Sequence, residues 1–344
     1  MDDISKARAK TLRSQRLTII VAAVILIVLF LVSFNLGRFE IPIIDVLKVI
    51  VSKVIPIEVT WPENYETVVL YIRLPRILAA ILIGGALALA GAAYQSVFKN
   101  PLVSPDVMGA SSGASLGAAI AIFMGLSNLY TQAFAFVMSL AAVGIAYFIS
   151  RRVKRDPTLA LILAGMFISS FCNAIVSLIK FVADPNDKLP TITYWLMGSL
   201  ANITLSDVGL VIIPMLIAGV PLFLLRWRLN VLSLGEDEAK ALGLETKRLR
   251  VIVILCATIL TATSIAISGL IGWVGLVVPH LARMLVGSNN KVLIPAATLM
   301  GGIFLLLVDN FARTMTTQEI PIGVLTAIIG APFFIFLLMR KKQV

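Results

Sequence analysis

The sequence predicts an all-α polytopic membrane protein, and three observations lead to this prediction. Of its 344 residues, 59% are hydrophobic and only 14% are charged, whereas a soluble domain carries about 25% charged residues. Residues 17–37, 77–98 and 107–150 contain no Asp, Glu, Lys or Arg, and a helix needs about 20 apolar residues to cross a bilayer. The alternating pattern of a transmembrane barrel is absent, so the spans are predicted to be helices.

The spacing of the apolar runs predicts about ten spans. The first two are residues 17–37 and 77–98, and the run 107–150 is long enough for two spans that divide near residues 125–129. The remaining predicted spans are 157–179, 208–225, 251–268, 270–286, 292–308 and 321–339. Residues 1–16 are predicted to be a cytoplasmic tail, and residues 17–342 a single transmembrane domain whose longest cytoplasmic connection is about 227–250.

The first span is predicted to stay in the mature protein. Its basic start and the following segment Leu17–Leu36 resemble a signal peptide. The apolar run is too long for one, however, and no small-x-small cleavage site follows it. We therefore interpret it as a retained membrane anchor.

Basic residues in the short connections predict the orientation. Ten spans place both termini on one side, and the connections on that side hold 21 of the 29 Lys and Arg residues, which marks it as cytoplasmic. The net charge of +11 is therefore a topology signal. Nucleic-acid binding is excluded because it requires a basic patch on a folded domain. Contact with anionic lipid headgroups is expected.

Several kinds of chemistry have no support in the sequence. Cys172, Cys256 and the single histidine His280 lie in separate apolar spans, so no metal site is expected. No G-x-x-x-x-G-K-[ST] phosphate loop is present, so this chain is not predicted to be an enzyme that hydrolyses nucleotide. Asp309 is the main intramembrane carboxylate, and it lies four residues before Arg313, the spacing of a local helical ion pair. Transport powered by a separate chain is therefore favoured over an ion-coupled secondary transporter, which remains the alternative.

Three arginines fall at the predicted outer ends of spans: Arg73, Arg76 and Arg313. One interpretation is interfacial anchoring, in which the long side chain reaches the headgroup level. The other is a positive docking surface for an acidic partner. The residues alone leave both interpretations open.

A proline-broken segment follows the second span on the cytoplasmic side. Pro101 and Pro105 interrupt the helix because proline has no backbone N–H to donate. Irregular backbone at membrane depth is tolerated where it lines a cavity or is buried in protein. We therefore hypothesise a gate at Asn100 and Leu102. Glycines in the flanking spans, at 84, 85, 91, 109, 113 and 117, are predicted to allow close helix packing.

The longest cytoplasmic connection is predicted to contain a short helix. Ser233 or Gly235 can begin it, acidic residues follow in its first turn, and Gly243 can end it. Ala239, Leu242 and Leu244 would give it a small apolar face. Such a helix suits the groove of a partner, although an ordinary solvated connection fits the same residues.

Taken together, these segments resemble the permeases of the iron-siderophore, haem and cobalamin uptake family of ATP-binding cassette importers. The resemblance runs from about residue 17 to 342 and rests on several motifs in a shared order. They are Arg73–Arg76, Gly91–Asp106, Met108–Ala114, Tyr194–Leu200, Leu234–Gly243, Gly272–His280 and Glu319–Pro332.

The resemblance implies a cobalamin-permease-like fold with ten spans per subunit, in which spans 2–5 and 7–10 form an inverted repeat. It implies a homodimer, or a pair with a close homologue, in the inner or plasma membrane, with both termini cytoplasmic. It also implies two ATPase subunits, which use ATP and Mg, while this chain binds no cofactor. The ATPases would dock on Gly235, Glu236, Glu238, Ala239, Leu242 and Gly243.

An extracytoplasmic binding protein would meet Arg73, Arg76 and Arg313, and Asn100 and Leu102 would belong to a cytoplasmic gate. The cargo would be a metal chelate, and ferric siderophore is the expectation because it is the most common cargo of the family. Haem, cobalamin and oxyanions such as molybdate remain open.

Overall fold

The computed structural model describes residues 2–37, 39–53, 55–153 and 157–339, and every regular element in these ranges is a helix. Six of the 29 Lys and Arg residues counted for topology lie outside them: Arg38, Lys154, Arg155, Arg340, Lys341 and Lys342. The helices in order are α1 (Asp2–Ser33), α2 (Ile43–Ser52), α3 (Glu63–Glu66), the π-helix η1 (Thr67–Arg73), α4 (Leu74–Val97), the 3₁₀-helix η2 (Pro105–Met108), α5 (Ala110–Phe123), α6 (Asn128–Ser150), α7 (Pro157–Val182), α8 (Lys188–Met197), α9 (Leu205–Leu234), α10 (Glu236–Ala241), α11 (Thr246–Ser268), α12 (Val274–Val286), α13 (Asn290–Thr314) and α14 (Ile322–Met339).

The predicted all-α polytopic class is confirmed. Seven helical segments are long and apolar enough to cross a membrane, and three shorter apolar helices accompany them in the described part of the chain. Each of the ten predicted spans overlaps one of these helices. The three shorter helices fall below the length of about 20 residues that a perpendicular crossing needs, so the number of crossings stays a prediction, as does the inverted repeat.

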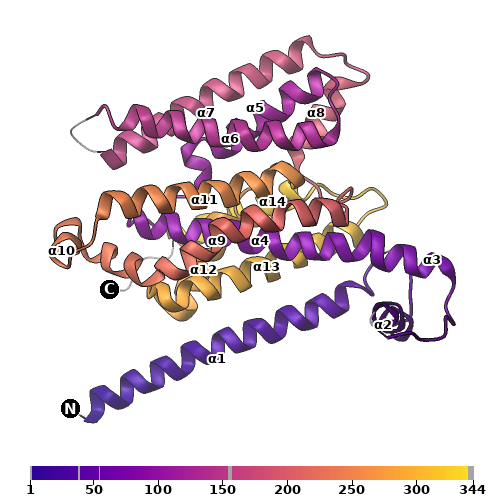
Figure 1. Ribbon diagram of the computed structural model, residues 1–344, viewed down its shortest axis with the longest axis horizontal. Coiled ribbons are helices and arrows are strands. Elements are labelled where there is room, and N and C mark those ends of the chain that lie inside the picture. Colours follow the sequence, from indigo (N-terminus) through magenta and orange to yellow (C-terminus); the bar gives the residue numbers. More distant parts are fainter. Residues whose placement is uncertain (1, 38, 54, 154–156, 340–344) are drawn as a thin grey trace.

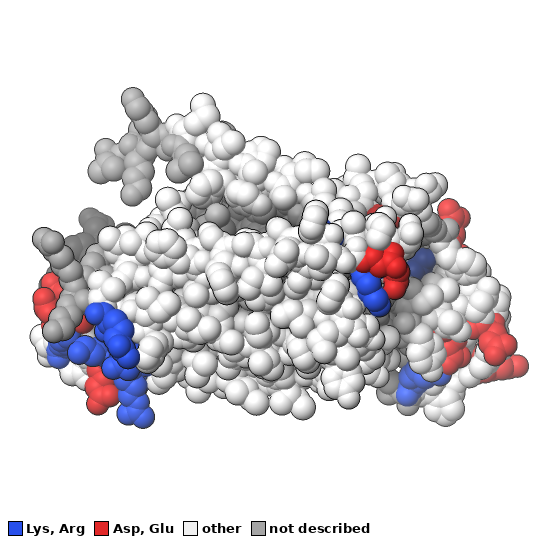
Figure 2. All heavy atoms as spheres, turned by 90° about the horizontal axis from the view of Figure 1, so that it is seen from above, with Lys and Arg blue, Asp and Glu red and all other residues white. Residues whose placement is uncertain are grey.

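The helices lie roughly along one long axis, in three groups (Figure 1). Helices α5 to α8 form one layer, α4 lies among α9 and α11 to α14, and α1 lies on the opposite side. The start of α1 and the short helix α10 occupy one end of the molecule, here called the inner end, whereas α2 and α3 occupy the other, the outer end. Figure 2 shows a broad uncharged belt between the two ends, which is the expected surface of a membrane span.

Helix α4 is the centre of the core, and glycines are what allow its neighbours to approach. In the most apolar 18-residue stretch of Glu63–Val97, 83% of the residues are buried, whereas only 11% are buried in the corresponding stretch of α1. A Cβ atom on Gly84 would lie 2.2 Å from the carbonyl oxygen of Gly301 on α13. A Cβ on Gly91 would lie only 1.8 Å from that of Gly275 on α12. The backbones therefore touch where only glycine fits.

The glycines of α5 have the same role, which confirms the close packing predicted from their spacing. A Cβ on Gly113 would lie 2.5 Å from the carbonyl oxygen of Met138, and one on Gly117 would lie 2.2 Å from that of Phe134. Both carbonyls belong to α6, so the glycine stripe of α5 faces that helix.

The second span begins earlier than predicted, and this changes the position of two arginines. Helical backbone starts at Glu63 instead of near residue 77, and it passes through the π-helix η1 before α4. Pro75 explains why the helix contains a π-helical stretch, because the proline ring would clash with the carbonyl four residues earlier in a regular α-helix. The wider π-turn just before it accommodates the proline without ending the helix. Arg73 and Arg76 therefore lie inside a long helix and not at its end.

Replacing Gly91 with alanine tests the close approach of α4 and α12. We expect Gly91→Ala to destabilise the protein by about 1–3 kcal/mol, because the new methyl group meets backbone that cannot rotate away. The matched control is Gly144→Ala on α6, where a Cβ meets nothing within 4 Å. Thermal unfolding in detergent should show a lower midpoint for Gly91→Ala alone; equal midpoints would contradict this account of the core.

Candidate functional site

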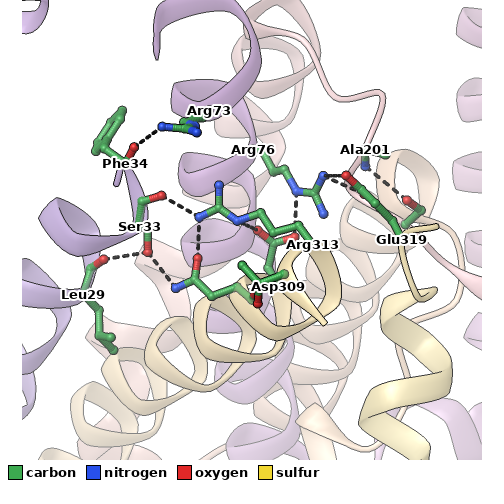
Figure 3. Close-up of polar contacts among 12 residues, drawn as sticks. Leu29, Ser33, Phe34, Arg73, Arg76, Ala201, Asp309, Arg313 and Glu319 are labelled. Carbon is green, nitrogen blue, oxygen red and sulfur yellow. Dashed lines mark hydrogen bonds and ion pairs between the residues drawn. The ribbon is translucent and has the colours of Figure 1, made fainter. Parts of the chain in front are cut away.

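A buried ionic cluster joins α1, α4, α13 and the segment after α13 near the outer end (Figure 3). We call it the arginine cluster; its charged members are Arg73, Arg76, Asp309, Arg313 and Glu319. The three arginine residues are only 4–6% exposed and Asp309 is fully buried. Glu319 is the exposed member, with 37% of its side chain accessible.

Arg76 is the centre of the cluster. Its Nε donates to Oδ1 of Asp309 at 2.8 Å, and its Nη1 donates to both carboxylate oxygens of Glu319 at 2.9 and 2.8 Å. One guanidinium thus links α4 to α13 and to the segment that follows α13. Hydrogen bonds between ionised groups are stronger than neutral ones, so this residue holds the two helices in a fixed register.

The other two arginines hold the end of α1. Arg313 donates to the carbonyl oxygen of Ser33 at 2.6 Å and to the side chain of Asn310. Arg73 donates to the carbonyl oxygens of Phe34 and Phe39. The last carbonyls of a helix have no partner within it, so the two guanidinium groups satisfy backbone acceptors where α1 ends.

This geometry corrects the expectation of an open positive surface at Arg73, Arg76 and Arg313. Their donors are directed at internal carbonyls and carboxylates, and two carboxylates offset two of the three charges. Docking of a partner on these arginines is not tested by one chain and stays a prediction. The predicted pair of Asp309 with Arg313 exists, with Nε 3.8 Å from Oδ2, but the nearer partner of Asp309 is Arg76.

The exposed charges at the outer end are mainly acidic in the described part of the chain. Figure 2 shows more red than blue at that end. The exposed acidic residues in its connections are Glu40, Glu58, Glu63, Asp184, Asp187 and Glu319, whereas Lys53 is an exposed cation there. Among the described residues, an approaching acidic partner therefore meets mainly negative charge at this end, apart from cations such as Lys53 and the partly exposed Lys48 and Lys188.

The predicted gate residues lie in an irregular segment, Phe98–Ser104, between α4 and η2. Lys99 has a positive φ of 50°, which turns the chain away from α4. The Oδ1 atom of Asn100 accepts a hydrogen bond from the backbone N–H of Leu102 at 2.9 Å, closing a local turn. Both side chains are exposed on the single chain, Leu102 to 44%, so they are available to a second subunit. Their role as a gate stays a prediction.

Three consecutive polar residues fix the inner end of α4, just before this segment. Tyr94 shares a 3.0 Å hydrogen bond with Thr258 on α11, and Gln95 donates to the carbonyl oxygen of Leu276 on α12 at 3.2 Å. Ser96 donates to Oδ1 of Asn290 on α13 at 2.8 Å. Successive helical residues point about 100° apart, so this polar triplet reaches three different helices. No role was predicted for this triplet, although three consecutive polar residues at the end of an apolar span are a signal visible in the sequence.

The short helix α10 forms where it was predicted, between Gly235 and Gly243, and Gly243 has the positive φ of 78° expected of a helix-ending glycine. Glu236 pairs with Lys240 at 3.2 Å and with Arg250 on α11 at 3.5 Å. The hydrogen bond from Lys240, assisted by the positive charge of Arg250, lowers the pKa of the Glu236 carboxyl below its ordinary value. These contacts hold α10 against α11.

The exposed face of α10 differs from the predicted one. Ala239 is fully buried against its own chain and Leu244 is half-buried, whereas Leu242 is 64% and Leu234 is 66% exposed. The helix turns Ala239 inward because its small side chain lets α10 lie close to the ends of α9 and α11. Glu238 and Leu242 remain available to a partner, beside a groove of about 540 Å³ lined in part by Trp227 and Arg248.

No group of three His, Cys, Asp or Glu side chains that could hold a metal ion occurs in the described ranges. Cys172 and Cys256 are buried free thiols. The cluster, the irregular segment and α10 are therefore the features that suggest function.

Comparison with known proteins gives one consistent result. The profile of the FecCD transport family matches residues 25–340. The molybdate import system permease protein MolB of Haemophilus influenzae is 40% identical over 93% of this chain and 94% of its own length. The Fe(3+)-citrate import system permease protein YfmE of Bacillus subtilis is 37% identical over 97% of this chain and 99% of its own.

A solved structure has the same fold. It is titled as an inward-facing conformation of a transporter of the metal-chelate ABC type, and it matches with a TM-score of 0.83 and 39% sequence identity. The match covers 93% of this chain and 98% of the solved chain.

The two carboxylates of the arginine cluster should differ in their contribution to stability. We expect Asp309→Asn to destabilise the protein by about 3–5 kcal/mol, because it leaves the buried Arg76 and Arg313 charges poorly compensated. Glu319→Gln should cost at most about 1 kcal/mol, since Glu319 reaches solvent. Thermal unfolding in one detergent compares the two; an equal or larger effect of Glu319→Gln would contradict this order.

Proposed function

Because the chain belongs to the FecCD transport family and is a permease of the ATP-binding cassette importer type, we propose that it imports a metal chelate into the cytoplasm by alternating access. The observation that carries the proposal is the similarity over almost the whole chain to permeases named for import. ATP hydrolysis is assigned to separate ATPase subunits, and the cargo is delivered by an extracytoplasmic binding protein. The working unit is a dimer of this chain, or of this chain with a close homologue.

The inner end is proposed to be cytoplasmic. Exposed Arg and Lys residues gather in its connections and in the helix ends beside them, among them Arg151, Arg152, Arg226, Arg228 and Lys247. Basic residues in short loops stay on the cytoplasmic side. Helix α10 is then on the side where ATP is available, and the exposed Leu234 at the end of α9 and Leu242 just after α10 are the apolar contacts offered to an ATPase groove.

The cargo is proposed to be a ferric chelate, and specifically a ferric siderophore. The Fe(3+)-citrate permease matches 97% of this chain, and the solved structure is of a metal-chelate type transporter. Molybdate is the second candidate because the permease MolB, named for molybdate, is 40% identical. Haem and cobalamin permeases also match, at 38% and 36% identity.

Docking of the binding protein on the arginine cluster is proposed to require an exchange of partners. Glu319 holds the outer face of Arg76 and is the exposed carboxylate of the cluster. A carboxylate on a binding-protein lobe can replace Glu319 at Arg76 without leaving that charge unpaired, because Asp309 remains bound to Nε. The step exchanges one ion pair for another, which avoids the cost of an isolated buried charge.

Uptake into proteoliposomes tests the function. The chain is reconstituted with its candidate ATPase and assayed with a ferric siderophore, Fe(3+)-citrate, haem, cobalamin and molybdate, each with its candidate binding protein. We expect uptake of a ferric chelate that requires ATP on the ATPase side and one binding protein. Molybdate uptake under the same conditions would change the cargo and keep the importer, whereas uptake driven by an ion gradient without ATP would overturn the function.

Docking of the ATPase on α10 has its own test. We expect Leu242→Asp to weaken association with the ATPase subunits at least about tenfold, because a charge would enter an apolar contact. The matched control on the same helix is Asp237→Asn, whose side chain is 97% exposed. Co-purification of the ATPase with each variant measures the effect. Unchanged association of Leu242→Asp would contradict docking at this face.

A further inference from the structure

Three polar residues connect the end of α9, which leads into α10, with the end of α4, which leads into the irregular segment. They are Asn230 on α9, Asn290 at the start of α13 and Ser96 on α4. They are separated by 60 and 194 residues in sequence, but they form one continuous chain of hydrogen bonds. No role in the proposed function has been assigned to them so far.

The α9 arm of this chain uses both ends of one amide. Asn230 Nδ2 donates to Oδ1 of Asn289 at 2.7 Å, and Asn230 Oδ1 accepts from the backbone N–H of Asn290 at 2.7 Å. Asn289 is also the N-cap residue of α13. The side chain of Asn230 is thus hydrogen-bonded to the first turn of α13, so a shift of the end of α9 would displace that turn or break these bonds.

The α4 arm begins at the same residue, Asn290, but at its side chain. Ser96 Oγ lies 2.8 Å from Oδ1 of Asn290 and also 2.8 Å from the carbonyl oxygen of Ala92 on its own helix. Ser96 is 7% and Asn290 is 2% exposed. A hydroxyl has one proton, so it can bond to α13 or to its own helix. The contact can therefore open and close without leaving the donor unpaired.

We propose that Asn230, Asn290 and Ser96 form a relay that transmits movement of α10 to the segment Phe98–Ser104. The inference rests on the proposed function, together with the premises that the ATPase subunits move α10 and that the segment forms the gate predicted from the sequence. Helix α9 ends where α10 begins, the relay crosses the first turn of α13, and Ser96 lies four residues before Asn100. The three residues act by positioning the gate, since none of them lies in the segment Phe98–Ser104 itself.

A second physical path runs through α11. Glu236 of α10 pairs with Arg250, and farther along the same helix Thr258 bonds to Tyr94 of α4. The two paths reach neighbouring residues of α4 from different helices, so they can be separated by mutation. The relay is favoured because it ends on a hydroxyl with two alternative acceptors, whereas Tyr94 is fully buried and stacked on Phe98 with ring centroids 5.7 Å apart.

The test reads the gate directly and requires no cargo. Leu102→Cys is introduced into the full chain, whose native cysteines are buried, and the complex with its ATPase subunits is placed in nanodiscs. The rate of thiol labelling by a polar maleimide is measured without nucleotide and with ATP and vanadate, and the ratio of the two rates reports gate movement. Asn230→Ala, Ser96→Ala and their combination are then compared in this background.

We expect each single variant to reduce the ratio of the two labelling rates about fivefold, toward one. This is the effect expected from the loss of one hydrogen bond. The double variant should be no worse than either single variant, because residues in series are not additive. Ser96→Thr, which keeps the hydroxyl, should restore the ratio. The matched control is Ser264→Ala, because Ser264 is fully buried and its hydroxyl bonds only to its own helix; it should keep the original ratio.

The relay is overturned if the unmodified background responds to nucleotide and the relay variants respond equally. Additive effects in the double variant would also overturn it. So would a result in which Thr258→Val, on the α11 path, abolishes the response to nucleotide while the relay variants keep it. The proposed function fails in a different way: the unmodified background itself would show no response to nucleotide. Variants that do not assemble with the ATPase are replaced by Asn230→Ser, for which the same loss of response is expected.

Discussion

The fold depends on the close approach of α4 to α12 and α13. At Gly84 and Gly91 the neighbouring backbones occupy the space where a Cβ would stand. In a membrane there is little hydrophobic gain from pressing helices together, so contact between backbones has to supply the packing energy. Small residues therefore recur along the middle of α4, with glycine at the points of closest approach to α12 and α13, and the polar residues of α4 lie near its two ends.

The two ends of α4 use different chemistry. The outer end is held by ion pairs, with Arg76 bound to Asp309 and Glu319. The inner end is held by neutral hydrogen bonds from Tyr94, Gln95 and Ser96. Charged groups buried at membrane depth are costly unless they are paired, so each arginine of the cluster has carbonyl or carboxylate partners. The cluster therefore specifies how α1, α4 and α13 fit together more than it adds net stability.

The sequence predicted what depends on local composition and missed what depends on tertiary partners. The spans were found because apolar length is a property of one segment, and α10 was found because glycines bound it on both sides. The surroundings of Arg73 and Arg313 could not be predicted, because their acceptors include backbone carbonyls at and just after the end of α1, which are distant in sequence and carry no sequence signal. The inward orientation of Ala239 could not be predicted either, because six residues make too short a helix to show which face packs.

The contrast between the two ends of α4 bears on how an importer of this kind can move. Breaking a buried ion pair by removing one partner costs about 3–5 kcal/mol, whereas leaving a buried neutral donor or acceptor without its hydrogen bond costs about 1–3 kcal/mol. The contacts at the inner end of α4 therefore break more easily than those at its outer end. The hydroxyl of Ser96 also has a second acceptor, the carbonyl oxygen of Ala92. Since α10 lies at the inner end, energy from ATPase subunits would enter where the contacts of α4 are easiest to exchange. The arginine cluster would then act as the fixed point, released only when another carboxylate replaces Glu319.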